Sequence, residues 1–284
     1  MTTGVLMIEL IPERAAMIIE SGSELNLVIA DLHIGYEATL GDKGINLPSQ
    51  VRRLLMNITA LIIEYQPDRL ILLGDIKHQV PGITELEVKD VPFFFKELLK
   101  MNLRQILIVP GNHDGRINEI IPRDDRLLIA PSRGIMLEDG NLSLGLLHGH
   151  TWPSIDLLNA DILVMGHTHP VIELRDSLGY RYLEPVWVKA PIVKEKLIEA
   201  YSKRKEEVEE ISLRSVIVMP AFNRLLGGNV LNRADTPRPL LGPLPESGAL
   251  DIGCSEVFLL DGTYLGTLNH LRAISTMKTS YEPS

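Results

Sequence analysis

Basic residues, aromatic residues and cysteine are all scarce in this chain of 284 residues. Lys and Arg number 28 against 37 Asp and Glu, a net charge of −9, so no basic surface that steers a polyanion is expected. Aromatic residues make up 5% of the chain, which argues against a stacking platform for nucleobases. Cys254 is the single cysteine. It excludes a disulfide within the chain and favours a reducing compartment, so we expect a cytoplasmic protein.

The sequence also lacks long apolar runs. None approaches the roughly 18 residues of a membrane-spanning helix, and residues 1–9 lack the basic and apolar regions of a secretory signal. We therefore expect no membrane association. The acidity is uneven, because residues 1–190 hold 17 basic against 25 acidic residues, and residues 191–284 hold 11 against 12. A phosphate-bearing substrate would have to be attracted locally.

Short apolar runs alternate with helical patterns in the first half of the chain. Runs at 25–30, 70–73 and 106–109 predict buried strands. Apolar residues at helical spacing predict helices from Pro48 to about residue 65 and over 88–101. The glycine-rich segment between the first strand and the first helix is expected to be a loop.

The later elements are predicted to be shorter. We expect strands at 126–129, 135–137, 142–147, 162–165, 215–219, 257–260 and 264–266, a hairpin of 171–173 and 180–183, helices at 153–159 and 194–210, and a proline-rich loop at 236–248. Continuous apolar runs suit strands covered on both faces, so two packed sheets with helices outside are the expected α/β fold. We expect one domain over 1–284, in which residues 25–175 hold the site and residues 176–284 complete the sandwich.

Metal-capable side chains follow five of the predicted strands. The five blocks are Asp31-Leu32-His33, Gly74-Asp75, Gly111-Asn112-His113-Asp114, His148-Gly149-His150 and Gly166-His167-Thr168-His169. A single histidine after a strand is more often structural, but five such strand ends in one chain are hard to explain by structure alone. Strand ends on one edge of a sheet are where sites assemble.

The residue types suit a site for two divalent cations. Neighbouring cations need a bridging anion, and Asp75 is the candidate. Side chains two residues apart in an extended segment point alike, so Asp31 can act together with His33. Nitrogen and oxygen ligands without a thiolate favour manganese first, then zinc, iron, nickel or cobalt, over magnesium. Two such cations with Asp31, Asp75 and a hydroxide keep a charge near +1, which attracts a phosphoryl oxygen.

The order of the five blocks resembles that of the calcineurin-like metallophosphoesterase superfamily. The segments 30–37, 218–223 and 261–266 further resemble a narrower, mainly archaeal branch, related to the SbcD nuclease and to a ligase-associated metallophosphoesterase. The resemblance implies a four-layer αββα sandwich of two mixed β-sheets flanked by helices.

The resemblance also implies a role for each block. One metal would be held by Asp31, His33, Asp75 and His169, and the other by Asp75, Asn112, His148 and His167. His113 would not bind metal. It would stabilise the phosphoryl transition state or protonate the leaving oxygen, with Asp114 orienting its ring.

Three assignments have alternatives. His148 and His150 compete for one ligand position, and the family pattern favours His148. His78, three residues after Asp75, is a substrate contact or, in our preferred reading, supports a ligand or lies at the surface. The charged helix at 194–210 is read as a solvated face, with a lid or partner-binding helix as the alternative.

We therefore expect a two-metal phosphoesterase that hydrolyses phosphodiesters through a metal-bridging hydroxide. The branch resemblance suggests a nuclease in DNA repair or nucleic-acid processing, with a DNA-repair or helicase protein as partner. The acidic catalytic half favours the alternative of a phosphodiesterase or phosphatase for small molecules such as cyclic nucleotides or monoesters. A scaffold without turnover would have lost ligands, and none of the five blocks has.

Overall fold

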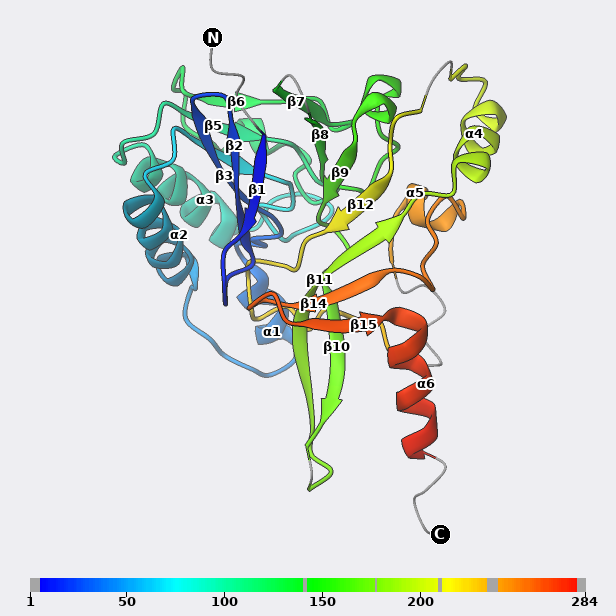
Figure 1. The fold of residues 1–284 in the computed structure, drawn as a ribbon. Coiled ribbons are helices and arrows are strands. Elements are labelled where there is room, and N and C mark those ends of the chain that lie inside the picture. The colour runs from blue at the N-terminus through cyan, green and yellow to red at the C-terminus, as the bar shows by residue number, and fades with distance from the viewer. Residues whose placement is uncertain (1–5, 140–141, 177, 209–210, 234–239, 280–284) are drawn as a thin grey trace.

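The strands of the chain form two sheets that pack face to face, and helices cover the outer face of each sheet (Figure 1). This is the expected four-layer α/β sandwich. The computed structural model describes residues 6–139, 142–176, 178–208, 211–233 and 240–279. Within these ranges no helix is long and apolar enough to cross a membrane.

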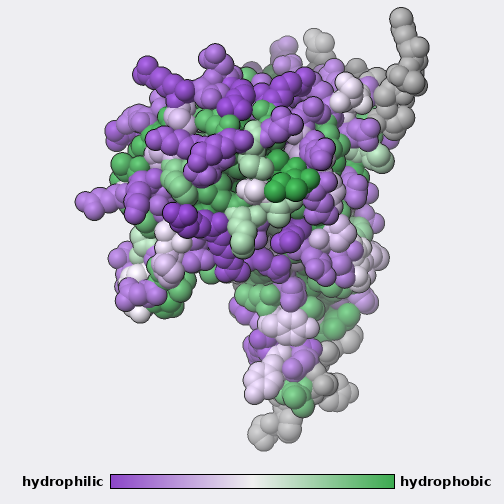
Figure 2. All heavy atoms as spheres, turned by 90° about the vertical axis from the view of Figure 1, so that its left-hand side faces the viewer, coloured by the Kyte–Doolittle hydropathy of each residue, from purple (hydrophilic) through white to green (hydrophobic). Residues whose placement is uncertain are grey.

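The first sheet has six strands in the order β1-β2-β3-β4-β5-β6, and β3 to β6 are parallel. Its strands are β1 (Met7–Leu10), β2 (Ala16–Ser21), β3 (Glu24–Ile29), β4 (Arg69–Leu72), β5 (Gln105–Ile108) and β6 (Leu127–Ile129). Helices α2 (Val51–Tyr65) and α3 (Glu85–Leu98) cover its outer face. This face is largely polar at its surface, with apolar side chains gathered near the centre (Figure 2).

The second sheet has nine strands, with β13-β10-β11-β12-β9-β8-β7 in order, β14 paired with β11, and β15 paired with β14. The strands are β7 (Ile135–Asp139), β8 (Leu142–Leu147), β9 (Ile162–Met165), β10 (Pro170–Arg175), β11 (Arg181–Pro191), β12 (Ser215–Val218), β13 (Asn229–Val230), β14 (Glu256–Leu259) and β15 (Tyr264–Thr267). The hairpin of β10 and β11 projects from the lower edge of the molecule (Figure 1).

Three apolar cores hold the layers together. Strand β4 shows why the sequences of the central strands are continuous apolar runs. Leu70 and Leu72 face α2 and α3, whereas Ile71 and Leu73 lie between the two sheets. All four are buried, so neither face of this strand tolerates polar residues. The third core lies under α4 (Lys194–Lys203), α5 (Pro243–Glu246) and α6 (Leu268–Thr279). The prediction of a single domain stays a prediction.

Several elements differ from the sequence prediction. The segment predicted to be a glycine-rich loop contains α1 (Tyr36–Asp42), and α5 lies inside the predicted proline-rich loop, of which residues 236–239 are outside the described ranges. Helix α3 begins at Glu85 because Thr84 and Glu87 form a capping box. Helix α4 ends at Lys203 rather than at residue 210, and residues 209–210 are not described.

Candidate metal centre

The five blocks meet where strands of both sheets end. In the first sheet, the amide of Asp31 donates to the Gly74 carbonyl at 3.2 Å, so the blocks after β3 and β4 lie side by side. In the second sheet, the amide of Gly166 donates to the His148 carbonyl at 3.0 Å. The His167 amide donates to Asp31 Oδ2 at 3.1 Å, which joins the two sheets at this point.

The backbone of these blocks takes an unusual conformation. Five expected ligands have positive φ: Asp31 (59°), His33 (44°), Asp75 (52°), His167 (68°) and His169 (48°). Nine non-glycine residues in the described ranges share this property, so more than half of them lie in the cluster. Such strain persists where the surrounding structure fixes it, and it concentrates at functional sites. The local conformation therefore marks these strand ends as a site.

One group of potential ligands consists of Asp31, His33, Asp75 and His169, whose ligand atoms lie within 4.8 Å of one another. His169 Nε2 is 3.1 Å from Asp31 Oδ1, and His33 Nε2 is 3.4 Å from Asp75 Oδ2. The Nε2 atoms of His33 and His169 are only 3.3 Å apart. Two ring nitrogens and two carboxylates thus converge on one small volume.

A second group consists of Asp75, His148 and His167, so Asp75 belongs to both groups. His148 Nε2 lies 3.3 Å from Asp75 Oδ2, and its Nδ1 donates to the Leu73 carbonyl at 2.8 Å. That contact fixes the ring and directs Nε2 toward the cluster. His148 Nε2 is fully buried and makes no hydrogen bond of acceptable geometry in the described structure. A buried nitrogen without a partner in this position is available to bind a cation.

The charge state of the cluster fits the same explanation. Burial opposes ionisation of Asp75, but the close contact with His148 Nε2 and the charge of that ring keep the pKa of Asp75 below the usual range. Burial lowers the pKa of His33 to about 3 and that of His167 to about 4, so both rings are unprotonated at neutral pH. Despite its burial, Asp75 and Asp31 raise the pKa of His148 to about 9, and a cation would replace that proton. The donor set therefore fits two divalent cations.

Gly111 shows how tightly the centre is built. A Cβ atom at this position would collide with both the backbone nitrogen and the Oδ1 atom of Asp75. The Oδ1 atom accepts a hydrogen bond from the His113 amide at 2.9 Å. Only glycine lets the loop after β5 approach Asp75 this closely.

The described structure has no hydrogen bond between the Asp114 carboxylate and the ring of His113, which was the expected contact. Asp114 is buried, and its carboxylate accepts hydrogen bonds from the amides of Ile76 and Gly111, both at 2.8 Å. It thus joins the loops after β4 and β5. The ring Nδ1 of His113 instead contacts the backbone carbonyl of His78, while Nε2 lies 3.8 Å from Asp75 Oδ2. The His78 carbonyl is therefore the group that contacts the His113 ring, and the orienting role of Asp114 stays a prediction.

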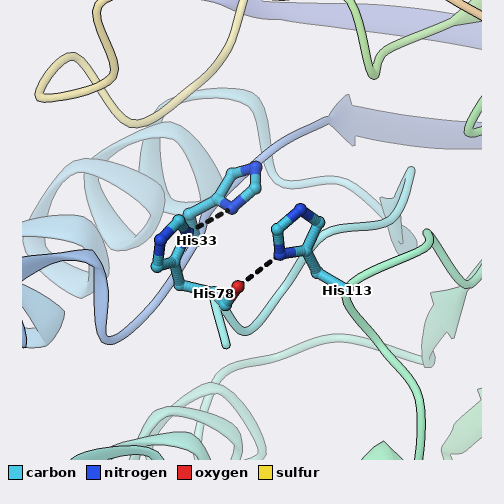
Figure 3. Close-up of side chains that lie close together, drawn as sticks. All are labelled: His33, His78 and His113. Carbon is cyan, nitrogen blue, oxygen red and sulfur yellow. Dashed lines mark hydrogen bonds between the residues drawn. The ribbon is translucent and has the colours of Figure 1, made fainter. Parts of the chain in front are cut away.

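His78 links two of the expected functional residues (Figure 3). Its Nδ1 lies 3.0 Å from His33 Nδ1, and its carbonyl contacts the ring of His113. The backbone of His78 is held in turn, because its amide donates to Oε1 of the buried Glu87 at 2.8 Å. The preferred reading of His78, support for a ligand, agrees with these contacts.

We expect His78→Ala to weaken metal binding. The ring of His33 would lose the partner of its Nδ1, and loss of such a partner costs about 10–100-fold in affinity. Titration of metal-free protein with Mn²⁺, with a competing chelator, measures the change. His270→Ala is the matched control, because His270 is exposed and outside the cluster. Equal affinity of the two variants would show that His33 needs no orienting partner.

Two expected residues take less central positions. Asn112 is exposed, and its side chain makes no hydrogen bond with the residues that the structure describes. Its role as a ligand stays a prediction. The ring of His150 lies 5.3 Å from that of His148, but among the described residues it belongs to neither group that includes Asp75. The choice of His148 as ligand therefore rests on the burial and direction of its Nε2.

An αββα sandwich with buried histidines and aspartates at its strand ends is typical of metallophosphoesterases. A model of the calcineurin-like phosphoesterase family matches residues 27–186, more than half of the chain. The chain therefore belongs to that family, whose members use divalent metals, and the family resemblance found in the sequence is confirmed.

Comparison with solved structures finds several similar chains. The nuclease MPE of Pseudomonas putida is 19% identical, with coverage of 90% of this chain and 98% of that chain and a TM-score of 0.48. The phosphoesterase YfcE of E. coli is 22% identical, with coverage of 53% and 74% and a TM-score of 0.34. Vacuolar protein sorting 29 of Cryptosporidium parvum is 25% identical, with coverage of 55% and 70% and a TM-score of 0.30. No curated protein sequence matches.

Proposed function

We propose that this chain is a two-metal phosphodiesterase. The observation that carries the proposal is the position of Asp75, which is shared by both groups of potential ligands. One cation would be held by Asp31, His33, Asp75 and His169, and the other by Asp75, Asn112, His148 and His167. When bound, the two cations would lower the pKa of a water molecule, so that it could act as the nucleophile. They would also neutralise charge on the phosphoryl oxygens. Manganese is the first expectation, followed by zinc, iron, nickel and cobalt.

His113 is proposed to act on the substrate. Its side chain is 23% exposed, in contrast to the buried His33 and His148, so it lies at the mouth of the centre. The His78 carbonyl accepts from Nδ1–H and leaves Nε2 to face a bound ester. From there the ring can donate a proton to the leaving oxygen. Asp114 serves this step indirectly, by fixing the loop that carries His113.

The proposed substrate is a phosphodiester, and a nuclease is the form that we favour. The family relationship supports phosphoester hydrolysis. The negative net charge does not oppose it, because the cations would supply the local attraction. A protein partner in nucleic-acid processing remains an expectation of the branch resemblance. The alternative substrates are cyclic nucleotides and small monoesters.

A metal and substrate panel tests the proposal. We expect metal-free protein to be inactive and Mn²⁺ to restore hydrolysis of bis-p-nitrophenyl phosphate, with p-nitrophenyl phosphate turned over more slowly. The panel compares Mn²⁺, Zn²⁺, Ni²⁺ and Mg²⁺, each with the His113→Ala variant as control. A preference for the monoester would favour a phosphatase. Full metal occupancy without turnover of any ester would favour a scaffold instead.

A further inference from the structure

A cavity of about 250 Å³ opens beside the candidate metal centre. His169 forms one wall, Asn223 and Arg224 add further polar groups, and most of the other lining residues are apolar. The apolar residues include Val171, Leu183, Pro185, Ala221, Leu225 and Leu226. Pockets for drug-sized molecules usually measure about 300–1,000 Å³, so this cavity suits a single ring system. A substrate bound at His169 can therefore place one flat, weakly polar group here.

The loop that closes this cavity is fixed to the metal-binding segment. The Phe222 amide donates to the Ala30 carbonyl at 2.9 Å, and Asn223 Nδ2 donates to the Leu32 carbonyl at 2.9 Å. Asn223 is buried, and its Oδ1 accepts from the Leu225 amide at 3.1 Å. Arg224 lies between two anchored residues and is exposed. Its backbone is therefore held at a set position relative to Asp31 and His33.

Arg224 also lines a second, smaller cavity of about 60 Å³, which shares Asn223 and Leu225 with the first and so continues it. Arg53 and Asn57 of α2 line this cavity with Gln50, the N-cap of that helix, and the three residues are spaced three and four apart on one face. Neither Arg53 nor Arg224 makes a side-chain hydrogen bond or ion pair within the described part of the chain. By contrast, the guanidinium of Arg52 lies over the Phe93 ring, 5.0 Å from its centroid. Two unpaired guanidinium groups thus flank a short groove that starts at the metal centre.

We propose that this groove binds single-stranded nucleic acid, with one base in the apolar cavity and the neighbouring phosphate between Arg224 and Arg53. The inference rests on the proposed phosphodiesterase function and extends it to the substrate class. Guanidinium groups bind phosphate oxygens in a bidentate manner, and the amides of Gln50 and Asn57 add donors. A small monoester has no second phosphate and would leave this part of the groove unused.

A single strand is the form that fits. The cavity beside His169 takes one ring system, and a base can enter it only when it is not stacked and paired in a duplex. The two arginines also supply the local positive charge that an acidic protein needs to bind a polyanion. Contacts to phosphate and to the flat base carry little sequence information, so we expect weak sequence preference.

The test compares a substrate that reaches the arginines with one that does not. Arg53→Ala/Arg224→Ala is assayed with Mn²⁺ on single-stranded DNA and RNA oligonucleotides of ten residues and on bis-p-nitrophenyl phosphate. We expect the ratio of the kcat/KM values, oligonucleotide over aryl diester, to fall at least tenfold, mainly through KM. We also expect the salt dependence of oligonucleotide binding to weaken, because fewer counterions are released.

Arg52→Ala is the matched control, because Arg52 belongs to the same helix but its guanidinium packs on Phe93, away from the groove. It should leave both activities unchanged. Equal losses on both substrates, or a ratio that does not change, would overturn the inference. Turnover of the aryl diester but of neither oligonucleotide by the unmodified protein would also overturn it, while the proposed phosphodiesterase function would stand. Absence of all turnover would instead remove the proposed function.

Discussion

Asp75→Asn is expected to empty both metal positions together. Asp75 Oδ2 lies 3.4 Å from His33 Nε2 and 3.3 Å from His148 Nε2, so one carboxylate serves both groups of ligands. Asparagine keeps the shape of the side chain but loses the negative charge, and one of its two positions becomes a donor. A donor cannot bind a cation, and the remaining donors would have to hold two cations with less compensating charge. The variant protein should therefore contain close to no Mn²⁺.

Metal analysis of the dialysed variant measures this result, and activity should fall more than about 100-fold, the upper range for loss of a residue that merely supports a ligand. Asp42→Asn is the control, because Asp42 is exposed at the end of α1 and outside the cluster. Circular dichroism should show both variants folded. Retention of one metal per chain in Asp75→Asn would mean that Asp75 belongs to one position and does not bridge.

The sequence was sufficient for the elements that carry the centre. Parallel strands buried on both faces need continuous apolar runs, and β3, β4, β5 and β9 have them. The edge strand β1 and its neighbour β2 were missed. In β1 exposed and partly buried residues alternate over only four positions, which is too short a pattern to recognise. Helix α1 was missed because Gly35 and Gly41 resemble loop residues, although Gly35 only provides the positive φ before its first turn.

The five blocks of the site could be predicted because their residue types reveal their chemistry. The contacts between them could not. The His78 carbonyl that orients His113 is a backbone group, so no residue type marks it. The family resemblance implied that Asp114 orients the His113 ring, but its carboxylate accepts hydrogen bonds from the amides of Ile76 and Gly111. Arg224 lies 193 residues after Asp31 in the sequence, and only the fold brings it beside the centre.

His113→Ala is expected to abolish most turnover while both metals stay bound. The His113 ring is not needed by either group of ligands that contains Asp75, and its Nε2 is 3.8 Å from the nearest carboxylate oxygen. Removing the ring therefore leaves Asp31, Asp75 and His148 in place. Loss of a general acid lowers kcat by about 10²–10⁴-fold, so the variant should combine full metal content with very low activity.

Substrates with different leaving groups distinguish proton donation by His113 from a general electrostatic role of its ring. An alkyl ester needs a proton on its leaving oxygen, whereas p-nitrophenolate is stable without one. If His113 supplies that proton, His113→Ala should lose far more activity on an alkyl or nucleoside diester than on bis-p-nitrophenyl phosphate. Equal losses on the two substrates would assign the ring to stabilisation of the phosphoryl oxygens. His33, His78 and His113 form a further group of side chains that could hold a cation, and loss of metal from the variant would make that group part of the metal centre.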